Sequence, residues 1–428
     1  MATGFETAFT MDTSSIKFGR GSTAEVGHDM KRLGANRVMV VTDHNVGLLP
    51  AVSTAVESLR SAGIDVVVYD GVRIEPTDSS FSDAISFAID GEFDGYVAVG
   101  GGSSIDTAKA ANLYATHPAE LLAYVNRPIG EGRHVPGPVR PLIAVPTTAG
   151  TGSETTGTAI FDLVDIHTKT GIAHRFLRPS LGIVDPDNTD SLPPLVAASS
   201  GFDVLSHALE SFTALPFDRR KAPEDPGLRP PYQGANPISD IWAEQALLLV
   251  ADNIVDAVTD PDNAAAREAM MLAATQAGIG FGNAGVHLPH AMSYPVAGGV
   301  EGFIPTDYDS SHPLVPHGIA VILTAPAVFR FTAPANPARH LEAARLIGAD
   351  VNGAAPDEAG DLLVARIIEL MRATGMPNGL QAVGYGTDDL DSLVAGTIPQ
   401  ERLTQLSPIP AGRSDLRAMF EQSLTLWS

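Results

Sequence analysis

The chain contains no cysteine among its 428 residues. Neither a disulfide framework nor a thiolate metal site is therefore possible, and any bound metal must use nitrogen and oxygen ligands. The start of the sequence also lacks a basic stretch followed by an apolar core, and it lacks an Arg-rich amphipathic helix. We therefore expect no export or organelle signal and a cytoplasmic protein.

Positive charge is also scarce, because 27 lysines and arginines face 50 acidic residues and leave a net charge of −23. Nucleic acid and anionic membranes both require basic surface, so we expect neither as a partner. The stretch from Ala269 to Val300 has no charged residue, but its prolines, glycines and histidines suit a buried helix pair around a site better than a membrane span. We expect small-molecule substrates and a homo-oligomer.

A chain of this length usually needs more than one hydrophobic core, so we predict two domains, residues 1–187 and 188–428. The first alternates apolar strands with amphipathic helices, which predicts an α/β dinucleotide-binding domain with a Rossmann-like parallel sheet. The predicted strands are Arg37–Thr42, Asp65–Tyr69, Tyr96–Val99 and Leu142–Val145, and the predicted helices are Ala51–Ala62, Ser80–Ile89 and Ser104–Tyr114.

A glycine cluster, GGGSSIDTAK, follows the predicted strand Tyr96–Val99 directly. Glycines let backbone N–H groups approach a pyrophosphate, and the next helix offers its positive N-terminal end to that anion. The predicted cofactor-binding residues here are Gly100, Gly101, Gly102, Ser103 and Asp106. Ser103 and Asp106 also have the spacing of a capping box, so a structural role stays open for them.

Two further features at strand ends favour NAD. Asp43 ends the first predicted strand, where a carboxylate accepts from ribose hydroxyls and repels a 2′-phosphate; capping of the next helix is the alternative. The loop PTTAGTGSE follows the fourth predicted strand, and its hydroxyls can donate to phosphate or nicotinamide, although an ordinary hydroxyl turn is the alternative. Its candidate residues are Thr147, Thr148, Thr151 and Ser153.

The second part of the chain has long helical patterns, which predict an all-α domain. The predicted helices are Leu195–Thr213, Pro237–Val258, Ala264–Gly278, His317–Phe331, Asp357–Thr374 and Leu416–Leu424. In the first of these helices Asp203 and His207 are four residues apart and share one face. As a pair they could be purely structural, but with His290 and His317 they form a first shell suited to Fe²⁺ or Zn²⁺.

A proline-rich segment from Leu215 to Pro237 carries a local cluster of positive charge. Such a segment is commonly a solvated surface loop. Its cations are also candidates for binding substrate carboxylates, because a guanidinium matches a carboxylate in a bidentate pair. The candidate substrate residues are Arg219, Arg220, Lys221 and Arg229.

The segments GFDVLSHALES, GVHLPHAMSYP and PHG resemble the metal-binding signatures of the iron-containing (group III) alcohol dehydrogenases. The runs RPPYQGANPISDIWA and GIGFGNAGVHLPHAMSYP resemble more particularly the hydroxyacid-oxoacid transhydrogenase branch of that family. The resemblance implies a metal-containing, NAD-dependent oxidoreductase in which Lys169 reaches the nucleotide. For the branch it implies 4-hydroxybutyrate as hydride donor and 2-oxoglutarate as acceptor.

The proton route departs from the broader family, in which many members have a histidine four residues after the third ligand. This chain has Tyr294 there, as the transhydrogenase branch does. Tyr294 and His287 are the candidate catalytic relays, although a tyrosine is less matched to neutral pH and His287 could be a core residue.

Three classes of function stay open from the sequence: a redox enzyme, a phosphate-eliminating cyclase and a non-catalytic protein. Within the redox class, an ordinary NAD-dependent alcohol dehydrogenase would use the same residues as a transhydrogenase but release NADH in each turnover. A phosphate-eliminating cyclase of the dehydroquinate synthase kind would need basic residues around the metal, whereas those of the second domain concentrate in one loop. A non-catalytic binding protein gives no reason for four metal ligands beside a nucleotide loop.

Overall fold

A computed structural model describes residues 4–166, 168–308, 310 and 312–428. The chain divides into two compact units. The sheet unit is Thr13–Leu192, and the helical unit is Pro193–Ser428 together with the stretch that ends at Asp12. The domain boundary predicted after residue 187 stays a prediction.

A parallel six-stranded sheet with the order β1-β8-β5-β4-β2-β3 forms the core of the sheet unit. Its strands are β1 (Ser15–Phe18), β2 (Arg37–Asp43), β3 (Asp65–Val72), β4 (Gly95–Gly100), β5 (Leu142–Pro146) and β8 (Leu181–Val184), and an antiparallel pair is formed by β6 (Thr158–Leu163) and β7 (Thr168–Ala173). The predicted parallel sheet is confirmed. Strands β1 and β8 were not predicted, because they have four residues each and carry little periodic signal.

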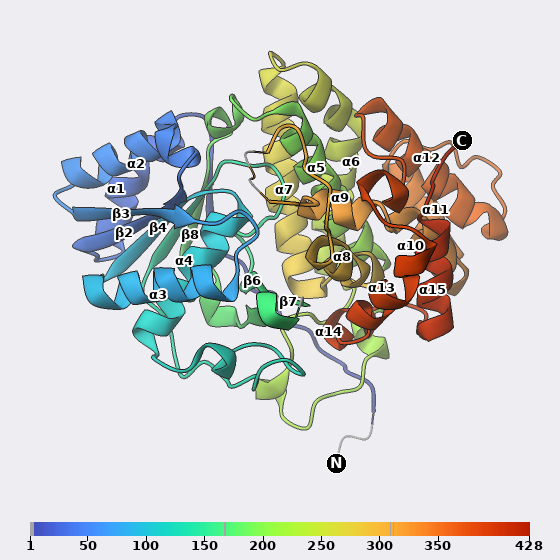
Figure 1. Cartoon of the computed structure of the whole chain (residues 1–428), viewed down its shortest axis with the longest axis horizontal. Helices are drawn as coiled ribbons and strands as arrows, with labels where there is room; N and C mark the ends of the chain where they lie inside the picture. Colours follow the sequence, from blue (N-terminus) through green and yellow to red (C-terminus); the bar gives the residue numbers. More distant parts are fainter. Residues whose placement is uncertain (1–3, 167, 309, 311) are drawn as a thin grey trace. The chain divides into compact units, whose positions relative to one another are not determined.

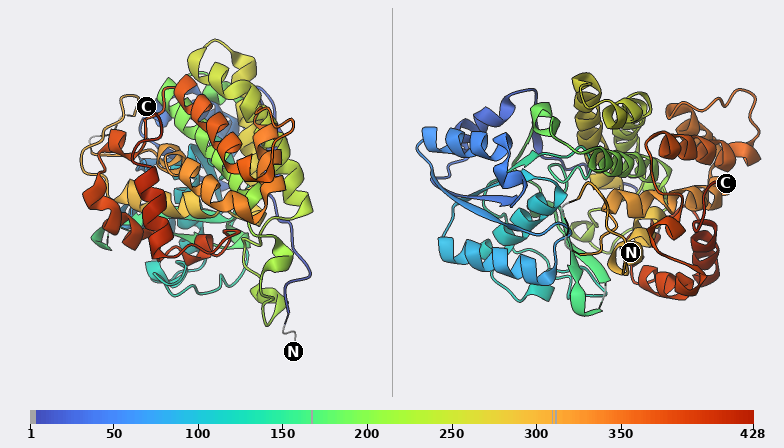
Figure 2. Two further views of the ribbon diagram at one scale, coloured as in Figure 1. Left: turned by 90° about the vertical axis from the view of Figure 1, so that its right-hand side faces the viewer. Right: turned by 45° about the horizontal axis from the view of Figure 1, so that its top comes forward.

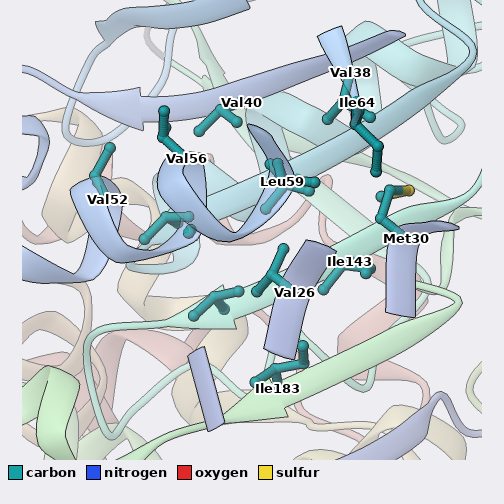
Figure 3. Packing of buried hydrophobic residues seen from close by; sticks show 14 of the residues in the cluster. Val26, Met30, Val38, Val40, Val52, Val56, Leu59, Ile64, Ile143 and Ile183 are labelled. Carbon is teal, nitrogen blue, oxygen red and sulfur yellow. The ribbon is translucent and has the colours of Figure 1, made fainter. Parts of the chain in front are cut away.

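Both faces of the sheet are covered by helices, as Figure 1 shows. Helices α1 (Val26–Arg32) and α2 (Pro50–Ser61) lie on one face, and α3 (Asp78–Gly91) and α4 (Gly102–Thr116) lie on the other. Val38 and Val40 of β2 pack towards α1 and α2 (Figure 3), whereas the alternate residues Met39 and Val41 pack towards α3 and α4. A strand buried on both faces explains the continuous apolar run in this part of the sequence.

The strand order reverses between β2 and β4, because β3 lies on one side of β2 and β4 lies on the other. Ligands of open parallel sheets bind at the carboxyl ends of the strands beside such a reversal. Asp43 ends β2 and Gly100 ends β4. The fold therefore places two of the predicted nucleotide-binding positions at the expected edge.

The regular secondary structure in the described part of the helical unit consists of helices, which confirms the predicted all-α class. These are α5 (Pro194–Thr213), α6 (Pro237–Thr259), α7 (Ala264–Ala284), α8 (Leu288–Gly298), α9 (His317–Ile322), α10 (Ala325–Thr332), α11 (Pro337–Leu346), α12 (Ala359–Ala373), α13 (Leu390–Thr397), α14 (Glu401–Thr404) and α15 (Arg413–Gln422). The predicted single helix His317–Phe331 is wrong, because the chain breaks after Ile322 and restarts with Pro326 in the first turn of α10. Proline cannot continue a helix but suits its beginning.

The charge-free stretch from Ala269 to Val300 forms most of α7 and all of α8, separated at Gly285. Gly285 has φ +93°, a conformation that favours glycine. Within the described residues, no helix is long and apolar enough to cross a membrane.

Candidate metal centre and nucleotide site

Helix α5 provides the base of the metal centre. Asp203, His207 and Glu210 occupy positions i, i+4 and i+7, which places them on one buried face. His290 comes from α8, and His317 is the first residue of α9. The four predicted ligands therefore come from three helices of one unit.

Oδ1 of Asp203 lies 3.6 Å from Nε2 of His207, 3.5 Å from Nε2 of His290 and 3.7 Å from Nε2 of His317. These distances are long for hydrogen bonds, but ligands held about 2.1 Å from one centre at tetrahedral angles are roughly 3.4 Å apart. Oδ1 of Asp203 and Nε2 of His290 are buried without a hydrogen-bond partner. The donor set therefore fits a cation, which would satisfy both atoms.

Asp203, His207 and His290 form the compact part of the set, with ligand atoms within 4.8 Å of one another. The ring of His207 stacks on Phe281 at 3.8 Å, which fixes its plane. The side chain of His317 is 26 % exposed, whereas those of the other three ligands are nearly fully buried. His317 therefore marks the side of the centre that is nearest to solvent.

Glu210 holds His290 in place, a role that was not predicted from the sequence. Its Oε1 accepts from Nδ1 of His290 at 2.5 Å, and its Oε2 accepts from the backbone N–H of His287 at 2.7 Å. A hydrogen bond at Nδ1 directs Nε2 of the same ring towards the cation and raises its basicity. The signal in the sequence was an acidic residue on the same face of α5 as Asp203 and His207, but its partner lies 80 residues away.

The electrostatics of this centre favour positive charge. Burial would raise the pKa of Asp203, but the neighbouring histidines outweigh it and lower that pKa. Burial would lower the pKa of His290, yet Glu210 and Asp203 raise it to about 10. Burial lowers the pKa of His207 to about 3, which keeps its ring neutral. Two buried carboxylates that favour positive charge, beside a neutral His207, are surroundings that suit a divalent cation.

The two candidate proton relays have different surroundings. Tyr294 is one turn after His290 on α8, its ring lies 6.5 Å from that of His317, and its hydroxyl accepts from Nη2 of Arg402 at 2.8 Å. His287 is fully buried, its Nε2 lies 3.1 Å from Oγ1 of Thr213, and burial lowers its pKa to about 4. His287 therefore has the surroundings of a core residue, whereas Tyr294 lies beside the ligands.

Two glycines of the cluster at the end of β4 leave no room for side chains. A Cβ on Gly100 would lie 2.4 Å from Oγ of Ser104, and one on Gly102 would lie 2.6 Å from Cγ2 of Thr151. Gly101 caps α4 without a side-chain hydrogen bond. The N-terminal end of this 15-residue helix is thus suited to an anion such as a pyrophosphate.

Asp43 is hydrogen-bonded to the turn that follows β2, and the N-cap residues of the next two helices are Asn45 and Leu49. Oδ1 of Asp43 accepts from the backbone N–H groups of Asn45 and Val46, both at 3.0 Å. Its Oδ2 points towards Gly100, because a Cβ placed on that glycine would lie 3.9 Å away. This turn uses one carboxylate oxygen, and the other faces the strand end where a ribose is expected.

The Thr147–Ser153 loop lies beside the glycine cluster, since β4 and β5 are neighbours. Thr148 is near Gly101, Thr151 is near Gly102, and the backbone of Thr147 donates to Gly100. These threonines thus lie beside the glycine cluster, and their contact with a nucleotide stays a prediction.

Two of the predicted cofactor residues are instead engaged in a buried network. Oγ of Ser153 donates to Asp106 at 2.6 Å and accepts from Nζ of Lys109 at 2.6 Å, and Asp106 also accepts from the backbone of Ile160. Burial lowers the pKa of Lys109 to about 8, although Asp106 opposes the shift. Ser153 has one proton, so its donation to Asp106 leaves none for a phosphate.

Ser103 and Lys169 are also tied to the sheet unit. Oγ of Ser103 accepts from the backbone of Glu75 at 3.3 Å. Nζ of Lys169, on β7, pairs with Glu75 at 2.6 Å and with Asp162 at 3.1 Å, and its side chain is 2 % exposed. These carboxylates raise the pKa of Lys169 although burial opposes them. In this arrangement Lys169 neutralises carboxylates next to the glycine cluster.

The four cations of the proline-rich segment differ in their exposure. Arg219 and Lys221 are exposed, whereas Arg220 and Arg229 are half-buried. Arg229 forms a bidentate pair with Glu6, at 2.9 and 3.1 Å. The strongest candidate for binding a substrate carboxylate thus already holds a carboxylate of the protein.

Comparison with known proteins identifies the family. Residues 13–186 match the model of the iron-containing alcohol dehydrogenases, and residues 232–424 match the C-terminal model of the same family. Hydroxyacid-oxoacid transhydrogenase of Rattus norvegicus is 54 % identical over 98 % of this chain and 90 % of its own length. The enzyme of the same name from Homo sapiens is 53 % identical, with the same two shares.

Solved structures agree with the predicted fold. A 1,3-propanediol oxidoreductase superposes with a TM-score of 0.84 at 29 % identity, covering 97 % of this chain and 100 % of that one. Sulfoacetaldehyde reductase from Bifidobacterium kashiwanohense, solved with NAD⁺, gives 0.78 at 27 % identity and covers 98 % and 99 % of the two chains.

The expected cytoplasmic location is wrong, because the transhydrogenases that resemble this chain are named as mitochondrial enzymes and point to that compartment. The expectation rested on the composition of the first residues, which carries no information about the compartment. The predicted cofactors, NAD and a divalent metal with iron foremost, are confirmed by the family and by the buried ligand set. The chain is an oxidoreductase that belongs to the iron-containing alcohol dehydrogenase family.

Proposed function

We propose that this enzyme transfers hydride from 4-hydroxybutyrate to 2-oxoglutarate on NAD that stays bound between the two half-reactions. The observation that carries the proposal is the buried set of Asp203 and three histidines, together with identity above half to transhydrogenases over nearly the whole chain. A cation held there supplies Lewis acidity towards a substrate oxygen, and NAD accepts and returns the hydride.

The roles of the residues follow from their surroundings. Asp203, His207, His290 and His317 hold the cation, and Glu210 orients His290. The N-terminal end of α4, with Gly100, Gly101 and Gly102, binds the pyrophosphate, and Thr147, Thr148 and Thr151 line the same edge. The free oxygen of Asp43 accepts from the ribose and favours NAD over NADP.

Tyr294 is the better candidate for moving the substrate proton. It lies next to His317 and one turn from His290, and its hydroxyl is hydrogen-bonded to Arg402. A relay must be within hydrogen-bond reach of the proton it moves, directly or through one water. His287 is fully buried and hydrogen-bonded to Thr213, so it is less suited to that role.

The test is a turnover assay without added nucleotide. Purified enzyme is incubated with 4-hydroxybutyrate, with and without 2-oxoglutarate, and succinate semialdehyde is followed by mass spectrometry. We expect many turnovers per enzyme only when 2-oxoglutarate is present. Turnover that requires added NAD⁺ and is indifferent to 2-oxoglutarate would instead make the chain an ordinary alcohol dehydrogenase.

A further inference from the structure

We propose that Arg402 binds the carboxylate of the substrate and so selects hydroxy acids and oxo acids over uncharged alcohols and aldehydes. This inference rests on the proposed function and identifies the residue that recognises its substrate class. It replaces the predicted role of the cationic segment, whose Arg229 is paired with Glu6.

Arg402 lies on the side of the metal centre that is nearest to solvent. His290 and Tyr294 are four residues apart on α8 and share a face, and the ring of His317 is 5.3 Å from His290 and 6.5 Å from Tyr294. The guanidinium of Arg402, on α14, lies 5.9 Å from the ring of Tyr294 and donates to its hydroxyl at 2.8 Å. Arg402 is therefore one side chain beyond the most exposed ligand.

Among the residues that the structure describes, no carboxylate neutralises the charge of Arg402. Among the described residues its side chain contacts the hydroxyls of Tyr294 and Tyr232, and no ion pair with a carboxylate is found. Other arginines of the helical unit contact carboxylates: Arg229, Arg330, Arg339, Arg345, Arg366 and Arg417. A half-buried cation left with two phenols, in a chain of net charge −23, is suited to an anion from outside.

The two tyrosines position the guanidinium without using all of its donors. An arginine has five N–H donors, and a carboxylate needs two of them for a bidentate pair. Tyr232 and Tyr294 also pack in one apolar cluster with Phe281, which stacks on His207. The same cluster thus contacts the metal ligand His207 and supports Arg402. It therefore fixes where the guanidinium lies relative to the metal centre.

The distance suits both proposed substrates. In 4-hydroxybutyrate the reacting carbon and the carboxyl carbon are separated by three C–C bonds, and the same spacing separates C2 of 2-oxoglutarate from its distal carboxyl carbon. With bonds of ~1.5 Å and a carboxylate–guanidinium contact of ~3 Å, each extended substrate reaches roughly 9 Å from its reacting oxygen. The ring of Tyr294 lies 6.5 Å from the ring of His317 and 5.9 Å from the guanidinium of Arg402, so these two contacts limit the separation of His317 and Arg402 to about 12 Å, and the reach of both substrates falls within that limit. One arginine can therefore receive the hydride donor and then the acceptor.

The experiment compares a charged and an uncharged donor of equal length. Reduction of enzyme-bound NAD⁺ is followed in a single turnover with increasing 4-hydroxybutyrate or 1-butanol, for wild type, Arg402→Met and Arg402→Lys. We expect Arg402→Met to raise the half-saturating concentration of 4-hydroxybutyrate about 10- to 100-fold and to leave that of 1-butanol nearly unchanged. Arg402→Lys keeps the charge, so its half-saturating concentration of 4-hydroxybutyrate should lie between those of wild type and Arg402→Met.

Two further variants make the comparison specific. Arg417→Met is the matched control, because Arg417 is exposed and pairs with Asp391 at 2.6 Å. Arg229→Met tests the rival segment. Metal content and Tm are measured for every variant, so that a loss of folding is seen directly. If Arg402→Met does not fold, the test is the ratio of the half-saturating concentrations of 4-hydroxybutyrate and 1-butanol in Arg402→Lys, compared with wild type.

Each outcome has a definite meaning. If the half-saturating concentrations of both donors rise equally in the Arg402 variants, Arg402 has a structural role and the proposal is overturned. If the half-saturating concentration of 4-hydroxybutyrate alone rises in Arg229→Met and does not rise in Arg402→Met, recognition belongs to the cationic segment. A wild type that oxidises 1-butanol but not 4-hydroxybutyrate would refute the proposed function itself, before any variant is compared.

Discussion

Glu210 contributes to the metal centre although it is not one of the ligands. It is fully buried and is hydrogen-bonded to the ring of His290 and to the backbone of His287. Its carboxylate therefore fixes both the direction of one ligand and the start of α8. A neutral amide of the same shape would keep one of these contacts but lose the charge that favours a cation.

Glu210→Gln should therefore weaken metal binding about 10- to 100-fold without unfolding the protein. The measurement is a competition titration of the purified protein with a chelator of known affinity. Glu369→Gln, on the exposed side of α12, is the control and should leave the affinity unchanged. Wild-type affinity in Glu210→Gln would show that Glu210 has no part in holding the cation.

Gly318 determines how closely α9 approaches α5. A Cβ at this position would lie 1.8 Å from the backbone oxygen of Ser199 and 3.2 Å from Cβ of Asp203. Gly318→Ala must push α9 away, and His317 is the residue next to it. We expect a marked loss of metal, measured by elemental analysis, and a lower Tm. Gly302→Ala, where a Cβ meets no atom within 4 Å, is the control; equal metal content in both variants would refute this prediction.

At the scale of elements, the N-terminal stretch holds the proline-rich segment. Phe5 pairs with Lys221, the N–H of Glu6 donates to Arg220, and Thr10 contacts Gln233. Figures 1 and 2 show the two segments side by side. Glu6 is 7 % exposed, and its pair with Arg229 lowers its pKa to about 2, although burial opposes the shift. The pair therefore connects residues 223 positions apart.

This pair predicts a pH-dependent contribution to stability. A carboxylate whose pKa falls from 4.5 to about 2 on folding stabilises the protein above pH 4.5 and loses that effect as the pH falls towards 2. The difference in Tm between wild type and Glu6→Gln should thus be constant near neutral pH and shrink below about pH 4.5. A difference that grows on acidification would contradict the assignment. In an Arg229→Met background, Glu6→Gln should have a smaller effect at every pH.

At the scale of the whole molecule, what could be predicted from the sequence was mainly local. The strands buried on both faces follow from continuous apolar runs, and Asp203 and His207 follow from their spacing on one helix. Contacts between distant segments could not be predicted in this way. Arg229 resembled a free cation because Glu6 lies 223 residues away. Ser153, in the loop after β5, resembled a cofactor ligand because its partners Asp106 and Lys109 lie 47 and 44 residues away on α4.

The chain also carries two sets of residues, one for a nucleotide and one for a metal, each within its own unit. Hydride exchange requires both sets to act first on the hydride donor and then on the acceptor. The central claim is therefore that the hydride of the donor appears in the product of the acceptor, and that no free nucleotide carries it.

The most direct measurement uses 4-hydroxybutyrate deuterated at C4, mixed with 2-oxoglutarate and enzyme but no added nucleotide. Mass spectrometry follows deuterium into 2-hydroxyglutarate. We predict labelled 2-hydroxyglutarate in molar excess over the enzyme, formed in equal amount with succinate semialdehyde. Formation of semialdehyde without labelled 2-hydroxyglutarate, or label that is lost when an NADH-consuming enzyme is added, would contradict the account.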